Sequence, residues 1–257
     1  MIELKTPSEM DAIAAAGAIV ADVLATVRAQ AAPGVRVSDL DAAAGDLIVA
    51  AGARPTFLNY LPRFASTPYP AVTCVSVNDA VVHGIPGPQV LADGDLVSID
   101  LAVHLDDWCA DSAISFVVGA ADPADLALID TAERALRAGI DASLAGAHLG
   151  DVGHAIESVA RAAGYGMLAD HGGHGVGRQM HEAPHVPNEG ERGRGMRLEP
   201  GLVFAIEPML IAGGGDRYRH DDDGWTLRTS DGSRAAHVEH TIGVTEDGPR
   251  VLTLKGA

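Results

Sequence analysis

Hydrophobic positions along the chain change from a helical spacing to a strand spacing, and this order of elements occurs twice. The first round opens with a stretch rich in Ala, Val and Leu at residues 7–30. Residues 6–9, Thr-Pro-Ser-Glu, match a capping box with proline at the first helical position, which predicts a helix here. Pro33-Gly34 ends it, and the polar cluster at residues 38–41 predicts a second helix that ends near residue 51.

Period-two alternation follows these helices, after a proline-rich loop. It predicts strands at residues 71–77, 96–104 and 109–118, each rich in Val, Ile, Ser or Thr. The last two are close enough in sequence to form a hairpin.

The same order returns in the second half. Asp122-Pro123 and Asp151 predict the starts of helices that reach about residues 145 and 163. Strands are then expected at residues 202–211, 226–228, 235–244 and 250–254, with Asp-Gly turns at 223–224 and 231–232. The repetition predicts an α+β fold of two pseudo-duplicated halves, about 1–120 and 121–257, with helices packed on one face of an antiparallel sheet. No linker rich in Pro, Gly or Ser divides the halves, so we expect a single domain over residues 1–257.

The composition excludes several classes of protein. With 18 basic and 35 acidic residues, the formal charge of -17 has the wrong sign for direct binding of nucleic acid. The chain contains two cysteines, Cys74 and Cys109, which favours a reducing compartment over a disulfide framework. No secretory signal is visible, and no apolar run reaches the ~20 residues of a membrane-spanning helix. We therefore expect a cytoplasmic protein with no membrane contact.

Two aspartates lie on the predicted hairpin among small side chains. Asp100 shares a face with Ser98 and Ala102, and Asp111 shares a face with its own small neighbours. If the turn between the strands has an even number of residues, both carboxylates lie on one side, within ~8 Å. A single strand aspartate is more often a solvated residue near a turn, but two carboxylates this close require a cation or a proton between them.

Three further side chains have the chemistry of metal ligands. His174 is flanked by glycines in residues 172–177, although a flexible turn would also explain the glycines. Glu207 ends an apolar strand and Glu239 lies within another, where each could instead be an ion-paired core residue. Together with the two aspartates they make four carboxylates and one imidazole, the composition of a two-metal hydrolase that uses Mn, Fe(II), Co or Zn.

A second motif, His-Glu-Ala-Pro-His at residues 181–185, matches the helical H-E-x-x-H zinc pattern as text. Pro184 disfavours helical geometry at the preceding residue, so the two histidines are not expected on one helix face. We interpret the match as accidental.

Five ordered segments resemble the type I methionine aminopeptidases, a family with the creatinase or pita-bread fold. They are residues 74–86, the strand pair that carries Asp100 and Asp111, and residues 173–184, 206–209 and 238–241. The resemblance covers nearly the whole chain and implies a curved antiparallel sheet covered by helices. It also implies an enzyme that uses two divalent metal ions (Co, Mn, Fe(II) or Zn) to remove the N-terminal methionine of nascent proteins when the second residue is small.

The resemblance assigns a role to each site residue. The expected metal ligands are Asp100, Asp111, His174, Glu207 and Glu239, with Asp111 and Glu239 bridging the ions. Glu207 would also carry a proton, His181 would bond the substrate carbonyl oxygen, and His83 would contact the scissile amide.

The expected methionine pocket consists of Tyr69, Cys74, Met180 and Trp225, whose polarizable and aromatic walls suit a thioether. This chain departs from the family in several places. Met180 stands where an aromatic residue is usual, residues 63–70 lack the usual Gly- and Tyr-containing loop, and His237 replaces a glutamine. Residues 221–223, three aspartates, are expected to form a solvated loop.

Two other functions stay open on the sequence. One is a proline-specific Xaa-Pro aminopeptidase or dipeptidase, which shares the metal ligands but usually carries an N-terminal domain, for which a helix beginning at Pro7 leaves no room. The other is a non-catalytic binding module of the same fold, which usually lacks ligands that are all present here. We expect a monomer that acts on the N-terminal methionine of peptides and nascent chains; a transient ribosome contact and the physiological metal stay open.

Overall fold

The computed structural model describes residues 2–62 and 65–255. Its helices are α1 (Pro7–Gln30), α2 (Val37–Ala50), α3 (Pro123–Ala142) and α4 (Leu149–Ala162). The strands of the first half are β1 (Arg54–Pro55), β2 (Cys74–Val77), β3 (Ala80–Val82), β4 (Leu96–Leu105) and β5 (Trp108–Val117). The strands of the second half are β6 (Gly166–Met167), β7 (Gly172–Gly175), β8 (Glu182–Pro187), β9 (Val203–Ile206), β10 (Met209–Ile211), β11 (Tyr218–His220), β12 (Leu227–Thr229), β13 (Ala235–His237), β14 (Glu239–Thr245) and β15 (Gly248–Val251).

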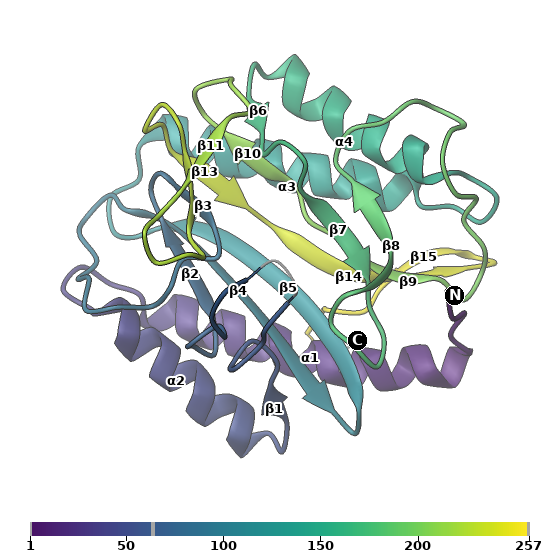
Figure 1. Cartoon of the computed structure of the whole chain (residues 1–257), viewed down its shortest axis with the longest axis horizontal. Helices are drawn as coiled ribbons and strands as arrows, with labels where there is room; N and C mark the ends of the chain where they lie inside the picture. The colour runs from purple at the N-terminus through teal and green to yellow at the C-terminus, as the bar shows by residue number, and fades with distance from the viewer. Residues whose placement is uncertain (1, 63–64, 256–257) are drawn as a thin grey trace.

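A nine-stranded sheet runs through both halves, in the order β1-β4-β5-β14-β9-β7-β8, with β2 paired to β4 and β15 to β14. Pairing of β5 with β14 joins the halves, and all strand pairings among the described residues are antiparallel. Figure 1 shows α1 and α2 against the strands of the first half and α3 and α4 against those of the second. The predicted α+β fold is therefore confirmed.

The helix starts follow the capping signals only in part. Thr6 and Glu9 form the predicted capping box of α1, in which the Thr6 N–H donates to Glu9 Oε2 over 2.8 Å. The second helix begins at Val37, one residue before the predicted cap, and α4 begins at Leu149, two residues before Asp151. Asp151 instead lies in the first turn, where its carboxylate accepts the N–H of His148, because an acidic side chain satisfies free N–H groups there as well as at the cap.

Helix α1 corrects one sequence expectation. Among residues 2–62 and 65–255 it is the single helix long and apolar enough to cross a membrane. Half of the stretch that passes this test is buried inside the protein, because α1 packs on β4 and β5. A core helix gives the same pattern.

Two predicted strands are each divided in two. The predicted strand 202–211 becomes β9 and β10, separated by Glu207 and Pro208, and the predicted strand 235–244 becomes β13 and β14, separated by Val238. Proline has no N–H to donate to a ladder, which explains the first break. The pair β9 and β14 belongs to the large sheet, whereas β10 and β13 belong to a three-stranded sheet with β6. Both breaks thus lie at the corner between the two sheets.

Candidate metal centre and active site

The hairpin β4–β5 brings the two predicted aspartates together. Its turn consists of Asp106 and Asp107, both with positive φ, and Leu105 pairs directly with Trp108. The turn is therefore even, and Asp100 is the partner of Ala113 while Asp111 is the partner of Ala102. The two carboxylates are diagonal neighbours on one face of the sheet, as the sequence predicted for an even turn.

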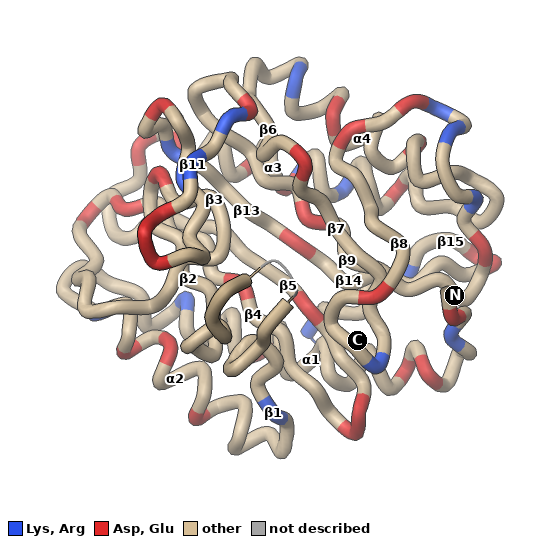
Figure 2. The backbone as a smooth tube through the Cα atoms, viewed as in Figure 1, with Lys and Arg blue, Asp and Glu red and all other residues tan. Residues whose placement is uncertain are grey.

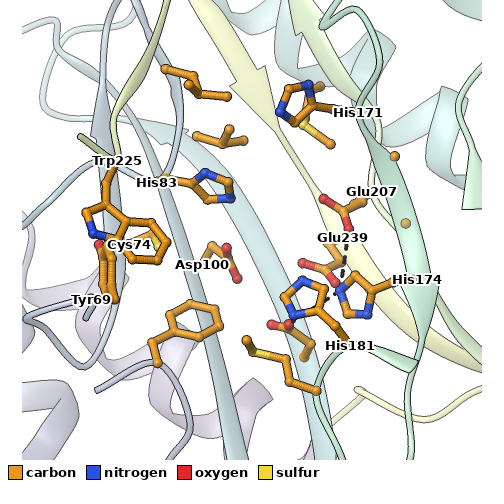
Figure 3. A pocket seen from close by; sticks show the side chains of 18 of the residues that line it. Tyr69, Cys74, His83, Asp100, His171, His174, His181, Glu207, Trp225 and Glu239 are labelled. Atoms are coloured by element: carbon orange, nitrogen blue, oxygen red, sulfur yellow. Dashed lines mark ion pairs between the residues drawn. The ribbon is translucent and has the colours of Figure 1, made fainter. Parts of the chain in front are cut away.

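The second half supplies three more ligand-type side chains to the same place. His174 lies in β7, Glu207 directly after β9, and Glu239 at the start of β14. His174 Nε2 is 3.6 Å from Glu207 Oε1 and 3.9 Å from Asp111 Oδ2. All five side chains line one cavity of about 650 Å³, and Figure 3 shows Asp100, His174, Glu207 and Glu239 projecting toward a common centre. Among the described residues, ligand atoms of Asp111, His174 and Glu239 lie within 4.8 Å of one another, which is ion-sized spacing.

The carboxyl groups are held in an environment that opposes their ionisation. Burial raises the pKa of Asp111 to about 7. Burial, and then the charge of Asp111, raises the pKa of Asp100, Glu207 and Glu239 well above the ordinary range. Figure 2 shows acidic positions along β5 and β14, in the middle of the large sheet. Without protons or cations, this concentration of negative charge is strongly unfavourable.

The polar atoms of the cluster fit divalent cations. Within the described part of the chain, one carboxylate oxygen each of Asp100, Asp111 and Glu239 is buried without a hydrogen-bond partner. His174 Nδ1 lies 3.0 Å from the carbonyl oxygen of Gly175 and donates to it, since that oxygen only accepts. His174 Nε2 therefore presents its lone pair to the carboxylates. A lone pair and an ionised carboxylate oxygen are both acceptors and cannot hydrogen-bond to each other, but both can bind a metal ion. This donor set suits Mn, Fe(II), Co or Zn.

Two neutral histidines stand beside the cluster. The His181 ring is centred 4.0 Å from that of His174, and burial lowers the pKa of His181 to about 3. His83 lies just after β3 with a positive φ of 59°, and burial lowers its pKa to about 4. Both imidazoles are thus uncharged at neutral pH and can donate a hydrogen bond from one nitrogen.

The four residues expected to form a methionine pocket line the same cavity: Tyr69, Cys74, Met180 and Trp225. The rings of Tyr69 and Trp225 meet edge to face, 5.1 Å apart. Tyr69 Oη lies 3.0 Å from the carbonyl oxygen of Thr73 and 2.9 Å from that of Gly84, and its single proton is shared between these two acceptors, which fixes this wall to the loop around β2. Of the atypical stretch 63–70, Arg63 and Phe64 lie outside the described residues.

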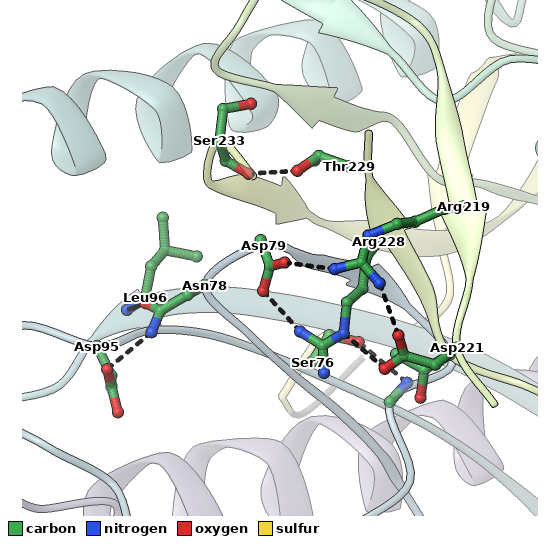
Figure 4. Close-up of polar contacts among 12 residues, drawn as sticks. Ser76, Asn78, Asp79, Asp95, Leu96, Arg219, Asp221, Arg228, Thr229 and Ser233 are labelled. Carbon is green, nitrogen blue, oxygen red and sulfur yellow. Dashed lines mark hydrogen bonds and ion pairs between the residues drawn. The ribbon is translucent and has the colours of Figure 1, made fainter. Parts of the chain in front are cut away.

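The prediction of a solvated loop at residues 221–223 is confirmed for Asp222 and Asp223, which are exposed, whereas Asp221 is partly buried in ion pairs that the sequence did not predict. Asp221 accepts from Arg228 Nε at 2.6 Å and from Arg219 at 2.9 Å, and Arg228 also donates to Asp79 at 2.6 Å (Figure 4). Asp223 accepts the N–H groups of Trp225 and Thr226, each at 2.8 Å. The physical reason is that β11 and β12 form a hairpin whose turn needs these acceptors. The loop holds the Trp225 wall of the cavity in place.

Several cavity residues had no recognisable signal in the sequence. They are Phe57, Tyr60, His171, Met209, Tyr218 and His220. His237, the residue that replaces a glutamine of the family, also reaches the cluster: its buried Nε2 lies 3.7 Å from Glu207 Oε2 and 4.0 Å from Glu239 Oε2. Residues 182–187 form strand β8, so the rejection of a helical zinc motif is confirmed.

Comparisons with known proteins identify the family of this chain. The model of "Metallopeptidase family M24" matches residues 11–246. The chain is 51% identical to methionine aminopeptidase 1 of Mycobacterium tuberculosis, over 99% of this chain and 96% of that protein, and 42% identical to the methionine aminopeptidase of Aquifex aeolicus, over 98% of each.

Solved structures give the same result. The methionine aminopeptidase of Rickettsia prowazekii superposes with a TM-score of 0.94 at 37% identity, over 99% of this chain and 100% of that one. The prolidase of Pyrococcus furiosus has a TM-score of 0.79 at 21% identity, over 99% of this chain and 66% of its own, which is a likeness of fold alone.

Proposed function

We propose how this chain, which belongs to metallopeptidase family M24, carries out its reaction with the residues gathered in the cavity. Its fold is the pita-bread fold expected from the sequence. The chain is an aminopeptidase that removes N-terminal methionine, and the proline-specific alternative is not favoured. The number of ions, the role of each side chain and the preference for a small second residue are proposals.

The cluster of four buried carboxyl groups around the His174 lone pair carries the metal assignment. We assign Asp100, Asp111, His174, Glu207 and Glu239 as the ligands of two divalent ions, Co, Mn, Fe(II) or Zn. In support, one buried carboxylate oxygen each of Asp100, Asp111 and Glu239 has no hydrogen-bond partner among the described residues and can bind a cation. Bound divalent ions would polarise the substrate carbonyl and lower the pKa of water toward neutrality.

Glu207 is the proposed proton carrier. Burial raises the pKa of its carboxyl group well above the ordinary range, so the group accepts a proton more readily than an exposed glutamate does. Its position directly after β9 also puts it at the open side of the cluster, where it is more exposed than Glu239. In this role Glu207 takes a proton from the attacking water and gives it to the amine that leaves.

His181 and His83 are the proposed hydrogen-bond donors to the substrate. As uncharged imidazoles, each has one N–H to offer, and a donor aimed at a carbonyl oxygen stabilises the charge that develops there. The substrate methionine would lie against Tyr69, Cys74 and Trp225, on the apolar side of the same cavity.

The test uses metal-stripped protein titrated with Mn, Fe(II), Co and Zn in a calorimeter, alongside cleavage of Met-Ala-Ser, of its norleucine analogue and of an Ala-Pro peptide. We expect two ions per chain and preferential release of methionine. In Asp100→Asn we expect weaker binding of at least one ion and loss of cleavage with the fold retained. Wild-type stoichiometry and activity in Asp100→Asn would contradict the ligand assignment.

The setting of the enzyme is also a proposal. We propose a monomer, folded as a single domain, that works in the cytoplasm on peptides and nascent chains, with at most a transient ribosome contact. Both cysteines are free and buried, and the formal charge of -17 opposes direct binding of nucleic acid. Size-exclusion chromatography with light scattering tests the monomer, for which a mass near 26.4 kDa is expected.

A further inference from the structure

Tyr60 occupies a fixed place on the rim of the cavity. Its N–H donates to the carbonyl of Phe57 at 2.9 Å, and its own carbonyl accepts the N–H of Tyr69 at 2.9 Å. The N–H of Asn59 returns a bond to the carbonyl of Tyr69 at 2.8 Å. This short loop is therefore tied to the segment that forms the wall of the cavity, and its geometry is defined by backbone bonds.

From this position the Tyr60 side chain makes two contacts with His181. The two rings are stacked, with centroids 5.4 Å apart and planes at 20°. Tyr60 Oη lies 2.9 Å from His181 Nδ1, which is hydrogen-bond distance. On its other contact, the His181 ring meets that of His174. Tyr60 thus constrains the orientation of the His181 ring by stacking and binds one of its two nitrogens by a hydrogen bond.

The direction of this hydrogen bond decides what His181 can do. A neutral imidazole has one donor and one acceptor nitrogen, and the bond made by one of them sets the role of the other. A phenol is a stronger acid than a neutral imidazole, so its O–H is the better donor and the bare ring nitrogen the better acceptor. If Tyr60 donates to Nδ1, the proton of the imidazole resides on Nε2, which is then the nitrogen that donates.

We propose that Tyr60 is a positioning residue that keeps His181 in the Nε2–H tautomer and in one ring orientation, so that Nε2–H is ready to bond the substrate carbonyl oxygen. The inference deepens the proposed function and rests on the role given there to His181. Tyr60 itself makes no contact with the reacting atoms in this scheme. A residue that only filled space at the rim would need its ring but not its hydroxyl group.

The test compares Tyr60→Phe, which keeps the stacked ring, with Tyr60→Leu, which removes it. For Tyr60→Phe we expect kcat to fall about tenfold, less than the loss of a complete oxyanion donor, while KM for a methionyl peptide changes little. For Tyr60→Leu we expect a larger fall in kcat, since orientation is lost as well. Tyr165→Phe, a hydroxyl deletion beside the core packed under α3 and α4, is the matched control and should keep wild-type kinetics.

A second readout does not depend on activity. In the metal-free protein labelled with ¹⁵N-histidine, the ring nitrogens of His181 are assigned by their absence in His181→Gln. We expect a protonated Nε2 and a hydrogen-bonded Nδ1 in the wild type, and in Tyr60→Phe a free Nδ1 with both tautomers present.

The outcomes separate this inference from the proposed function. A wild-type spectrum with the proton on Nδ1, an unchanged spectrum in Tyr60→Phe, or a rise in KM with kcat unchanged would overturn the role of Tyr60 while leaving methionine release intact. Failure of the proposed function would appear instead as an inactive wild type, and the spectra would still report the tautomer. Because the wild-type spectrum alone decides the direction of the hydrogen bond, the inference stays testable if a variant does not fold.

Discussion

Replacement of Asp111 by asparagine should stabilise the metal-free protein at alkaline pH, although it removes a proposed ligand. Asp111 is fully enclosed in the carboxylate cluster, and burial raises its pKa from the ordinary value of 3.8 to about 7. In Asp111→Asn the side chain keeps its shape but never ionises. The metal-free wild type, in contrast, must either bind a proton there or tolerate a buried charge.

The sign and size follow from linkage between protonation and folding. Since the folded state binds this proton more tightly than the unfolded state, the stabilisation by the protonated form is complete below pH 3.8 and is lost as the pH rises through about 7. The difference between these two pKa values corresponds to about 4 kcal/mol, at about 1.36 kcal/mol for each pH unit. The buried histidines titrate in both proteins, so the comparison isolates the Asp111 carboxyl group together with the effect of its charge on Asp100, Glu207 and Glu239. We therefore expect a gap near zero at pH 4 that grows to about 4 kcal/mol at pH 8.

Urea unfolding of the EDTA-treated proteins, followed by circular dichroism at several values between pH 5 and pH 8, measures this gap. Asp46→Asn, on the exposed side of α2, is the control and should match the wild type within about 0.5 kcal/mol at every pH. Addition of Mn or Co should reverse the order, because ions stabilise the folded wild type and bind the variant less well. Equal stability of wild type and Asp111→Asn at pH 5 and at pH 8 would refute the reasoning from buried charge.

Two further substitutions test the frame around the site. At Gly173, a Cβ atom would lie 2.0 Å from the carbonyl oxygen of Ala205, so Gly173→Ala should shift strand β7, lower the free energy of unfolding in urea by about 1–3 kcal/mol and weaken metal binding. The control is Gly215→Ala, which should be neutral because the added Cβ meets nothing within 4 Å. Equal stabilities of the two variants would contradict the close strand contact. Arg228→Met removes the partly buried ion pairs of Arg228 with Asp79 and Asp221 and should raise KM severalfold with a smaller change in kcat. The control is Arg134→Met, which removes an exposed ion pair and should leave the peptide kinetics unchanged. An unaltered KM in Arg228→Met would show that the β11–β12 hairpin does not support the pocket wall.

The parts of the fold that sequence patterns predicted correctly are those that depend on neighbours in the chain. The capping box of α1 involves residues three positions apart. The hairpin β4–β5 follows from a two-residue turn between alternating strands, and this local register is sufficient to put Asp100 and Asp111 on one face. The candidate metal ligands, four carboxylates and one histidine, were also recognisable in the sequence because carboxylate and imidazole side chains are common metal ligands.

Tyr60 shows why the remainder of the site was not predictable. It lies in a proline-rich loop without alternation, and its neighbour in space, His181, is 121 residues away in the sequence. Their contact depends on backbone bonds between the loops at residues 57–60 and 69, and no period or motif encodes such bonds. The ion pairs of Asp79 and Asp221 were not predictable for the same reason: a strand was expected at residues 226–228, where Arg228 lies, but no pattern indicates which side chains contact that arginine across the sheet.

The two strand breaks that the patterns missed have a direct bearing on the chemistry. Within a regular antiparallel ladder, side chains approach closely as opposed or diagonal neighbours, and the pairing of β5 with β14 extends the ladder that holds the two aspartates into the second half. Glu207 lies in the break between β9 and β10, and Glu239 begins β14 directly after the break at Val238. Glu239 pairs with Ala113 of β5, the residue that also pairs with Asp100, and Glu207 directly follows β9, which pairs with β14, so both glutamates lie beside the aspartates of the other half.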